Sequence, residues 1–209
     1  MEKTDLNDEQ YTRLLNAVFR ILLEKGPSHT TMDLVAARLS MSKRTLYEIF
    51  GSKDDMLRDV MDYQNQLHRR EMESIFHSTG NAMEAMAKAM TYIQKTFESV
   101  DVSFFRDMDK RCRHLRNDYD GRMSELNNQL GLVFALGIRQ GVFRKGIDYD
   151  LQLRLLRVQM ESLKRMEEFF PPEITLAQAY SAIAQGFLRG IATPQGIEIL
   201  EGMINDRHQ

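Results

Sequence analysis

Several features that often fix a fold or a site are scarce in this chain of 209 residues. It contains one cysteine, Cys112, no tryptophan and four prolines, and it has no apolar run of about 18 residues that could span a bilayer. A single cysteine cannot form an intramolecular disulfide, and it excludes a zinc site made of cysteines alone. The sequence therefore favours a protein of a reducing compartment.

The chain also lacks the signals of export and of metal binding. Its first ten residues, MEKTDLNDEQ, are polar and acidic, without the basic start and apolar segment of a secretory signal, so we expect a cytoplasmic protein. The five histidines never stand four residues apart, and Cys112 and His114 have no second pair at zinc-finger spacing. We expect neither a metal nor another cofactor.

Positive charge is not in excess. The chain carries 28 Lys and Arg against 30 Asp and Glu, a net charge of −2. A protein with this balance that binds nucleic acid must do so through a local patch of positive charge.

Helical periodicity, by contrast, is abundant. Apolar residues recur at helical spacing almost everywhere, and the alternating Val, Ile and Thr runs of strands are missing, so we predict an all-α fold. Gly26 and Pro27 end the first helix, and residues 51–55 form a boundary at which Ser52 caps a long helix. The expected helices cover residues 8–25, 32–39, 43–50, 53–77, 82–98, 103–116, 119–140, 150–169, 175–190 and 195–204.

The second and third helices are joined by a turn of three residues, Ser40 to Ser42. The third helix splits into two faces: Leu46, Ile49 and Phe50 point inward, while four polar or amphipathic side chains are left for an outside partner, namely Lys43, Arg44, Thr45 and Tyr47. A helix that begins with cations and hydroxyls after such a turn is typical of a helix-turn-helix that enters the major groove of DNA. A helical hairpin inside an ordinary bundle, with Lys43 and Arg44 as solvated charges, has the same spacing.

The segment from Thr30 to Leu57, TTMDLVAARLSMSKRTLYEIFGSKDDML, resembles the DNA-binding segment of the tetracycline-repressor (TetR) family of bacterial regulators. The matching elements, in order, are Thr30-Thr31, Val35-Ala36, Ser42, Thr45-Leu46-Tyr47, Phe50, Ser52-Lys53 and Met56-Leu57. The resemblance implies a sequence-specific DNA-binding transcriptional regulator that is not an enzyme, with double-stranded operator DNA as its partner. It places the DNA-binding domain at residues 1–51 and a helical domain for effector binding and dimerisation at 52–209.

The same resemblance implies roles for individual residues. Four would hold the phosphate backbone, namely Thr31, Ser42, Tyr47 and Lys53, and three would approach base edges, namely Lys43, Arg44 and Thr45. Ser40 departs from the pattern because glycine usually holds that turn position, and a left-handed serine would cost on the order of 1 kcal/mol. Arg44 stands where a small residue is common, and its contact could be to a base or to phosphate.

The larger domain is expected to form a homodimer through the helices at about 150–169 and 175–190. Their apolar residues would pair across a two-fold axis, or else form internal core, and they are Leu151, Leu155, Val158, Met166, Leu176, Tyr180, Ile183, Ala184, Phe187 and Leu188. A small-molecule effector, unidentified, is expected in an apolar pocket whose candidate residues are Phe104, Phe105, Met108, Met123 and Phe134. The basic run over residues 107–116 is better explained as a solvated helix face with ion pairs four residues apart than as an anion site.

Three functions compete at this point. The first is a ligand-responsive regulator, a repressor or an activator, on a palindromic operator. The second is a helical enzyme, but the sequence has no HExxH, GxSxG, Walker or ExxH pattern that would nominate its active site. The third is a helical interaction module that does not bind DNA.

Overall fold

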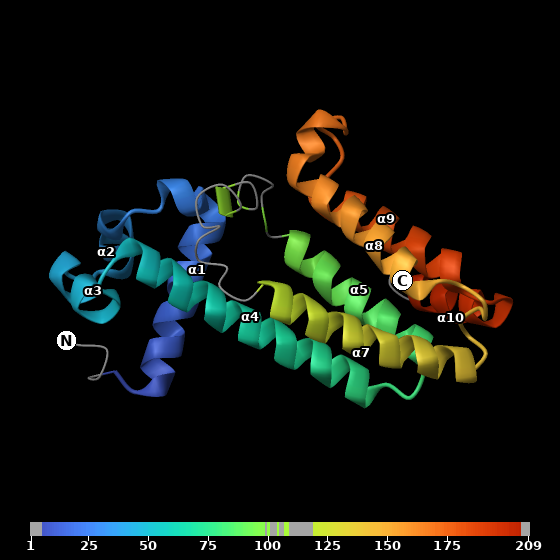
Figure 1. Cartoon of the computed structure of the whole chain (residues 1–209). Helices are drawn as coiled ribbons and strands as arrows, with labels where there is room; N and C mark the ends of the chain where they lie inside the picture. Colours follow the sequence, from blue (N-terminus) through green and yellow to red (C-terminus); the bar gives the residue numbers. More distant parts are fainter. Residues whose placement is uncertain (1–5, 99, 101–103, 105–106, 109–118, 206–209) are drawn as a thin grey trace. The chain divides into compact units, whose positions relative to one another are not determined.

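The computed structural model describes residues 6–98, 100, 104, 107–108 and 119–205. Within these ranges the fold is all-α, with no strand beyond one isolated bridge between Phe143 and Ala192 (Figure 1). No helix of this described part is long and apolar enough to cross a membrane. Its helices are α1 (Asp8–His29), α2 (Met32–Leu39), α3 (Lys43–Phe50), α4 (Lys53–Ser78), α5 (Ala82–Glu98), α7 (Tyr119–Arg139), α8 (Tyr149–Ser162), the 3-10 helix η3 (Leu163–Glu168), α9 (Leu176–Ile191) and α10 (Pro194–Asn205).

These bounds confirm the all-helical prediction and most of the expected ranges. Gly26, with φ 74° and ψ 154°, breaks the helical conformation of α1 where the Gly-Pro pair predicted an end. The helix predicted over 150–169 is divided, because Arg165 leaves helical geometry inside η3 with φ −125° and ψ 30°. The helix predicted over 103–116 lies almost entirely outside the described residues.

The chain forms two compact units. The first comprises Met1–Arg70 with Val100–Asn117, and the second comprises Glu71–Ser99 with Asp118–Gln209. The division falls within α4, so this helix contributes to both units. The functional boundary between residues 51 and 52 stays a prediction.

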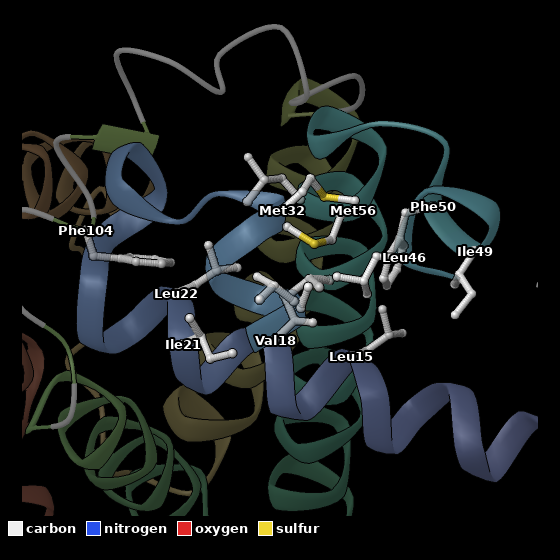
Figure 2. Close-up of a cluster of buried hydrophobic side chains, with 14 of the residues drawn as sticks. Leu15, Val18, Ile21, Leu22, Met32, Leu46, Ile49, Phe50, Met56 and Phe104 are labelled. Carbon is white, nitrogen blue, oxygen red and sulfur yellow. The ribbon is translucent and has the colours of Figure 1, made fainter. Parts of the chain in front are cut away.

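A buried apolar cluster holds the first unit together (Figure 2). Helix α1 contributes Leu15, Val18, Ile21 and Leu22, which recur at three- and four-residue intervals and so share one face. The other helices of the unit contribute Met32, Val35, Ala36, Leu46, Ile49, Phe50, Met56, Leu57 and Val60. The first three helices therefore pack as one body with the first part of α4.

Two residues from much later in the chain complete this cluster. Val100 and Phe104 are 9% and 4% exposed, and the ring of Phe104 meets that of Phe19 edge to face, with centroids 6.3 Å apart. Polar contacts between α1 and α4 flank the same core: the Tyr11 hydroxyl donates to Asp59 Oδ2 at 2.5 Å, and Gln64 Nε2 donates to Asn16 Oδ1 at 3.0 Å.

In the second unit, α9 packs against α5 and α8, and α5 also contacts α7 and α10. The helices α8 and α9 lie side by side (Figure 1). Gly196 at the start of α10 permits a close approach, since a Cβ built there would stand 2.2 Å from the carbonyl oxygen of Val142. Phe134 lies among aromatic rings, stacked on Tyr149 at 4.7 Å and meeting Phe143 at 6.0 Å.

The broad apolar face of α9 belongs to this internal core. Leu176, Tyr180, Ala184 and Leu188 are all buried within the chain itself. Met166, in η3, is also buried. For these residues the internal-core alternative is correct, and pairing across a two-fold axis is not.

Candidate nucleic-acid interface

The turn between α2 and α3 is closed by backbone hydrogen bonds. Ser40 has a left-handed backbone conformation, with φ 54° and ψ 37°, which glycine adopts more easily than other residues. This conformation lets the Met41 N–H donate to the Ala36 carbonyl at 2.9 Å and the Ser40 N–H to that of Ala37 at 3.4 Å. The pair of bonds is a Schellman motif, which ends α2 and redirects the chain into α3.

Helix α3 has the two faces that the sequence predicts. Leu46, Ile49 and Phe50 are buried in the first unit's core, whereas Lys43, Arg44 and Tyr47 are exposed and Thr45 is half-buried. Tyr47 is 44% exposed although its ring is large and mostly apolar. The exposed face is therefore open to an outside partner along the length of the helix.

Hydroxyl groups cap both helices of the motif. Thr31 Oγ1 accepts from the Leu34 N–H at 3.1 Å, and Ser42 Oγ accepts from the Thr45 N–H at 3.0 Å. The hydroxyls of Ser42 and Thr45 also share a hydrogen bond of 2.7 Å. These exposed groups lie at helix N-termini, where unpaired N–H groups and the helix dipole favour an anion such as phosphate.

The two cations of α3 each have an acidic partner. Lys43 Nζ lies 2.7 Å from Asp33 Oδ1, and Arg44 Nε donates to Glu48 Oε1 at 2.8 Å. The hydrogen bond and charge of Asp33 raise the pKa of Lys43, and those of Glu48 raise the pKa of Arg44. The reciprocal bond from Arg44 lowers the pKa of Glu48. All three groups are therefore charged at neutral pH.

Lys53, the remaining residue predicted to contact the phosphate backbone of DNA, makes a hydrogen bond within the first unit. Its Nζ donates to the Pro27 carbonyl at 2.8 Å, which joins the start of α4 to the end of α1. An ammonium group has three donors, so this bond leaves others for a phosphate. The seven predicted DNA contacts thus all lie in the first unit, on or beside α2, α3 and the start of α4.

Three of the five predicted effector residues have described side chains. Phe104 is in the first unit's core and Met108 packs against it, while Phe134 lies in the aromatic cluster of the second unit. Phe105 and the side chain of Met123 lie outside the described part of the chain. The effector pocket remains a prediction for all five residues.

Sequence reasoning missed the acidic partners of the cations. Arg44 and Glu48 stand four residues apart on one helix, and that spacing could have revealed their pair. Asp33 and Lys43 are ten positions apart on different helices, and no local pattern signals their contact. In the described residues, no group of three or more His, Cys, Asp and Glu side chains is placed to hold a metal ion.

A helix-turn-helix with an outward face of cations and hydroxyls, on an all-helical chain, defines the class of DNA-binding transcriptional regulators. Residues 14–60 match the family model described as "Bacterial regulatory proteins, tetR family". This segment of the chain is therefore similar to the transcriptional regulators of that family. The match covers most of α1, the whole helix-turn-helix and the first turns of α4, and so coincides with the interface described above.

Similar proteins cover more of the chain. The HTH-type transcriptional repressor KstR2 of Rhodococcus jostii (strain RHA1) is 25% identical over 158 residues, which are 70% of this chain and 74% of that repressor. The structure of the ketosteroid transcriptional regulator KstR2 of Mycobacterium tuberculosis has a TM-score of 0.57 at 21% identity, with 90% of this chain and 97% of that one covered. The structure of the transcriptional regulator FadR of Bacillus subtilis, in complex with stearoyl-CoA, has a TM-score of 0.63 at 17% identity, with coverages of 87% and 99%.

Proposed function

We propose that the protein is a ligand-responsive repressor that binds a palindromic operator as a homodimer, in the cytoplasm. The observation that carries the DNA-binding part is the geometry of α3, whose buried face fixes it in the first unit while Lys43, Arg44 and Tyr47 face outward. One helix of eight residues makes few contacts, so a two-fold partner that doubles them is needed for affinity. The two recognition helices would then enter major-groove turns roughly 34–36 Å apart, or a multiple of that spacing.

The second unit offers a face for this partner. Leu151, Leu155 and Val158 recur on one side of α8 and are 50%, 50% and 68% exposed. The exposed side of α9 carries the small residues Ala182, Gly186 and Gly190 at four-residue intervals, and no atom would meet a Cβ built at either glycine within 4 Å. An apolar ridge beside a shallow helix face suits close packing of the same two helices from a second copy.

The effector is proposed to be a small molecule with a large apolar part that binds the second unit near Phe134. The aromatic and methionine-rich interior supports an apolar ligand. The stearoyl-CoA in the FadR complex and the ketosteroid in the name of KstR2 fit the same chemistry. To act as a switch, the effector must bind the free and DNA-bound states with different affinity, and DNA must weaken its binding by the same factor.

Operator binding is tested by charge reversal. The Lys43→Glu/Arg44→Glu protein should lose binding to the promoter DNA of its own or a neighbouring gene in a mobility-shift assay. The matched control, Lys88→Glu/Lys95→Glu, makes the same charge change on exposed residues of α5 and should bind normally. Binding by the wild-type protein should also weaken steeply with salt, with a log–log slope of about −0.9 per neutralised phosphate. Equal binding by both reversed proteins would refute the assignment of α3.

The dimer and the effector have separate tests. Leu155→Asp/Val158→Asp should yield a monomer in sedimentation equilibrium, while Leu132→Asp, at a 74% exposed position of α7, should leave the dimer intact. Stearoyl-CoA and a ketosteroid, added to the wild-type complex, are the first probes for release of DNA. If neither releases DNA, the proposed class of effector is wrong, whereas the DNA-binding proposal is unaffected.

A further inference from the structure

The guanidinium of Arg44 forms a hydrogen bond along one edge, and its other edge is available to an outside partner. Its side chain is 88% exposed, and its Nε donates to Glu48 Oε1 at 2.8 Å, one helical turn further along α3. Glu48 is less exposed, at 29%, so the carboxylate lies closer to the helix surface than the arginine head. Within the described part of the chain, this is the contact that the structure gives Arg44.

A guanidinium has five N–H donors, and the bond from Nε uses one on its inner edge. The two Nη groups remain, and together they form the fork that donates two parallel hydrogen bonds. Guanine offers two matching acceptors, O6 and N7, in the major groove, and an arginine that donates to both is the commonest specific contact to DNA. Phosphate, in contrast, would approach Arg44 beside the negative charge of Glu48, and that repulsion disfavours a backbone contact.

We propose that Glu48 is a positioning residue that holds Arg44 to read a guanine in each operator half-site. The inference rests on the proposed function of α3 in DNA binding and decides which kind of contact Arg44 makes. An exposed ion pair at this spacing adds little to stability, since such pairs contribute only a few tenths of a kilocalorie. Its effect is to restrict the rotamers of a long side chain before DNA arrives, so that less conformational entropy is lost on binding.

The pair of Lys43 with Asp33 provides a matched comparison. It is also exposed, with 2.7 Å between Nζ and Oδ1, and it also joins a cation of α3 to a carboxylate. An ammonium group is a compact charge with three rotating donors. Unlike a guanidinium, it has no planar pair of donors that an acidic partner could orient toward a base. Removal of Asp33 should therefore leave the readout of guanine unchanged.

The experiment is selection of bound sequences from random DNA by the full-length dimer, followed by affinities for the selected site and for its single-base variants. The wild-type protein should select a guanine at one position of each half-site. Arg44→Ala should reduce the preference for that guanine about tenfold to a hundredfold. Glu48→Ala should reduce the preference for the same guanine about twofold to tenfold. Glu48→Gln retains an acceptor for Nε, so its preference should lie between those of Glu48→Ala and the wild type. Asp33→Ala should keep the wild-type preference for that guanine.

The double variant Arg44→Ala/Glu48→Ala distinguishes positioning from direct readout. If Glu48 acts through Arg44, the double variant should show no loss beyond that of Arg44→Ala alone. Loss at a different base in the Glu48→Ala protein would make Glu48 a direct reader, and it would overturn the inference. So would a uniform loss of affinity in Arg44→Ala with a salt slope reduced by about 1, the signature of a phosphate contact. A wild-type protein that selects no DNA at all would instead overturn the proposed function.

Discussion

Replacing Ser40 by glycine should stabilise the first unit. Ser40 is the one residue other than glycine with a positive φ in the described ranges, and its φ of 54° and ψ of 37° are those of a left-handed helix. A Cβ in this conformation lies too close to the following carbonyl oxygen, at a cost of about 1–2 kcal/mol. The Schellman motif at the end of α2 requires the conformation, so the backbone cannot relax without losing the Met41 to Ala36 bond.

The net gain is smaller than this cost. Glycine has more freedom in the unfolded chain, and that entropy offsets about 0.5–1 kcal/mol of the relief. Ser40 is exposed, and its hydroxyl has no hydrogen bond to any described residue, so its removal breaks no native contact. We expect Ser40→Gly to raise the free energy of unfolding by about 0.5–1 kcal/mol. With a urea m-value of about 2 kcal/mol/M, the midpoint should rise by about 0.25–0.5 M.

The measurement is equilibrium unfolding in urea, followed by circular dichroism at one fixed protein concentration, because dimerisation would make the midpoint depend on concentration. Ser40→Ala is the control: it keeps the Cβ and loses the hydroxyl, so it should give no gain. A midpoint for Ser40→Gly that is equal to or below that of the wild type, with an unchanged m-value, would refute the argument from backbone strain.

Three further substitutions test the packing. Phe104→Ala should lower the free energy of unfolding by about 3–5 kcal/mol in the same urea assay, because the ring is 4% exposed, and a loss under about 1 kcal/mol would contradict its place in the core. Gly196→Ala should cost about 1–3 kcal/mol or more, since its Cβ would stand 2.2 Å from the Val142 carbonyl oxygen; a thermal midpoint like that of the wild type would argue against this close approach. Tyr11→Phe removes a hydrogen bond to the Asp59 carboxylate and should cost about 1.5–3 kcal/mol, whereas an equal loss in an Asp59→Ala background, which has no acceptor, would show that the two groups are not coupled.

The helix-turn-helix was predictable almost to the residue because its signals are local. Ser42 caps α3 through a hydrogen bond that spans three residues, and Gly26 interrupts α1 beside a proline. The strain at Ser40 was open to prediction for the same reason, since glycine usually holds that turn position in the family pattern. Local signals of this kind need no knowledge of what else packs nearby.

Contacts between distant segments were not predictable in this way. The contact of Phe104 with Phe19 in the first unit's core joins segments far apart in the sequence, and no local pattern signals it. The pair of Asp33 with Lys43 joins two helices whose mutual orientation depends on the turn and the core together. In both cases the residue type gives the kind of contact, and only the packing of the whole unit gives the partner.

The two helices of the proposed dimer interface show what helical periodicity can and cannot predict. Both α8 and α9 carry apolar residues at helical spacing, and that pattern predicts that one face of each helix is removed from water. It does not say whether the same chain or a second copy covers that face. The structure separates them: Leu176, Tyr180 and Leu188 of α9 are covered by their own chain, whereas Leu155 and Val158 of α8 are not. The proposed two-fold pairing would therefore use the ridge of α8 and the small-residue side of α9, not the face with the larger hydrophobic residues. Because small residues let helix backbones approach closely, a bulky substitution at the open Gly186 should disrupt the dimer while leaving the fold of each protomer intact.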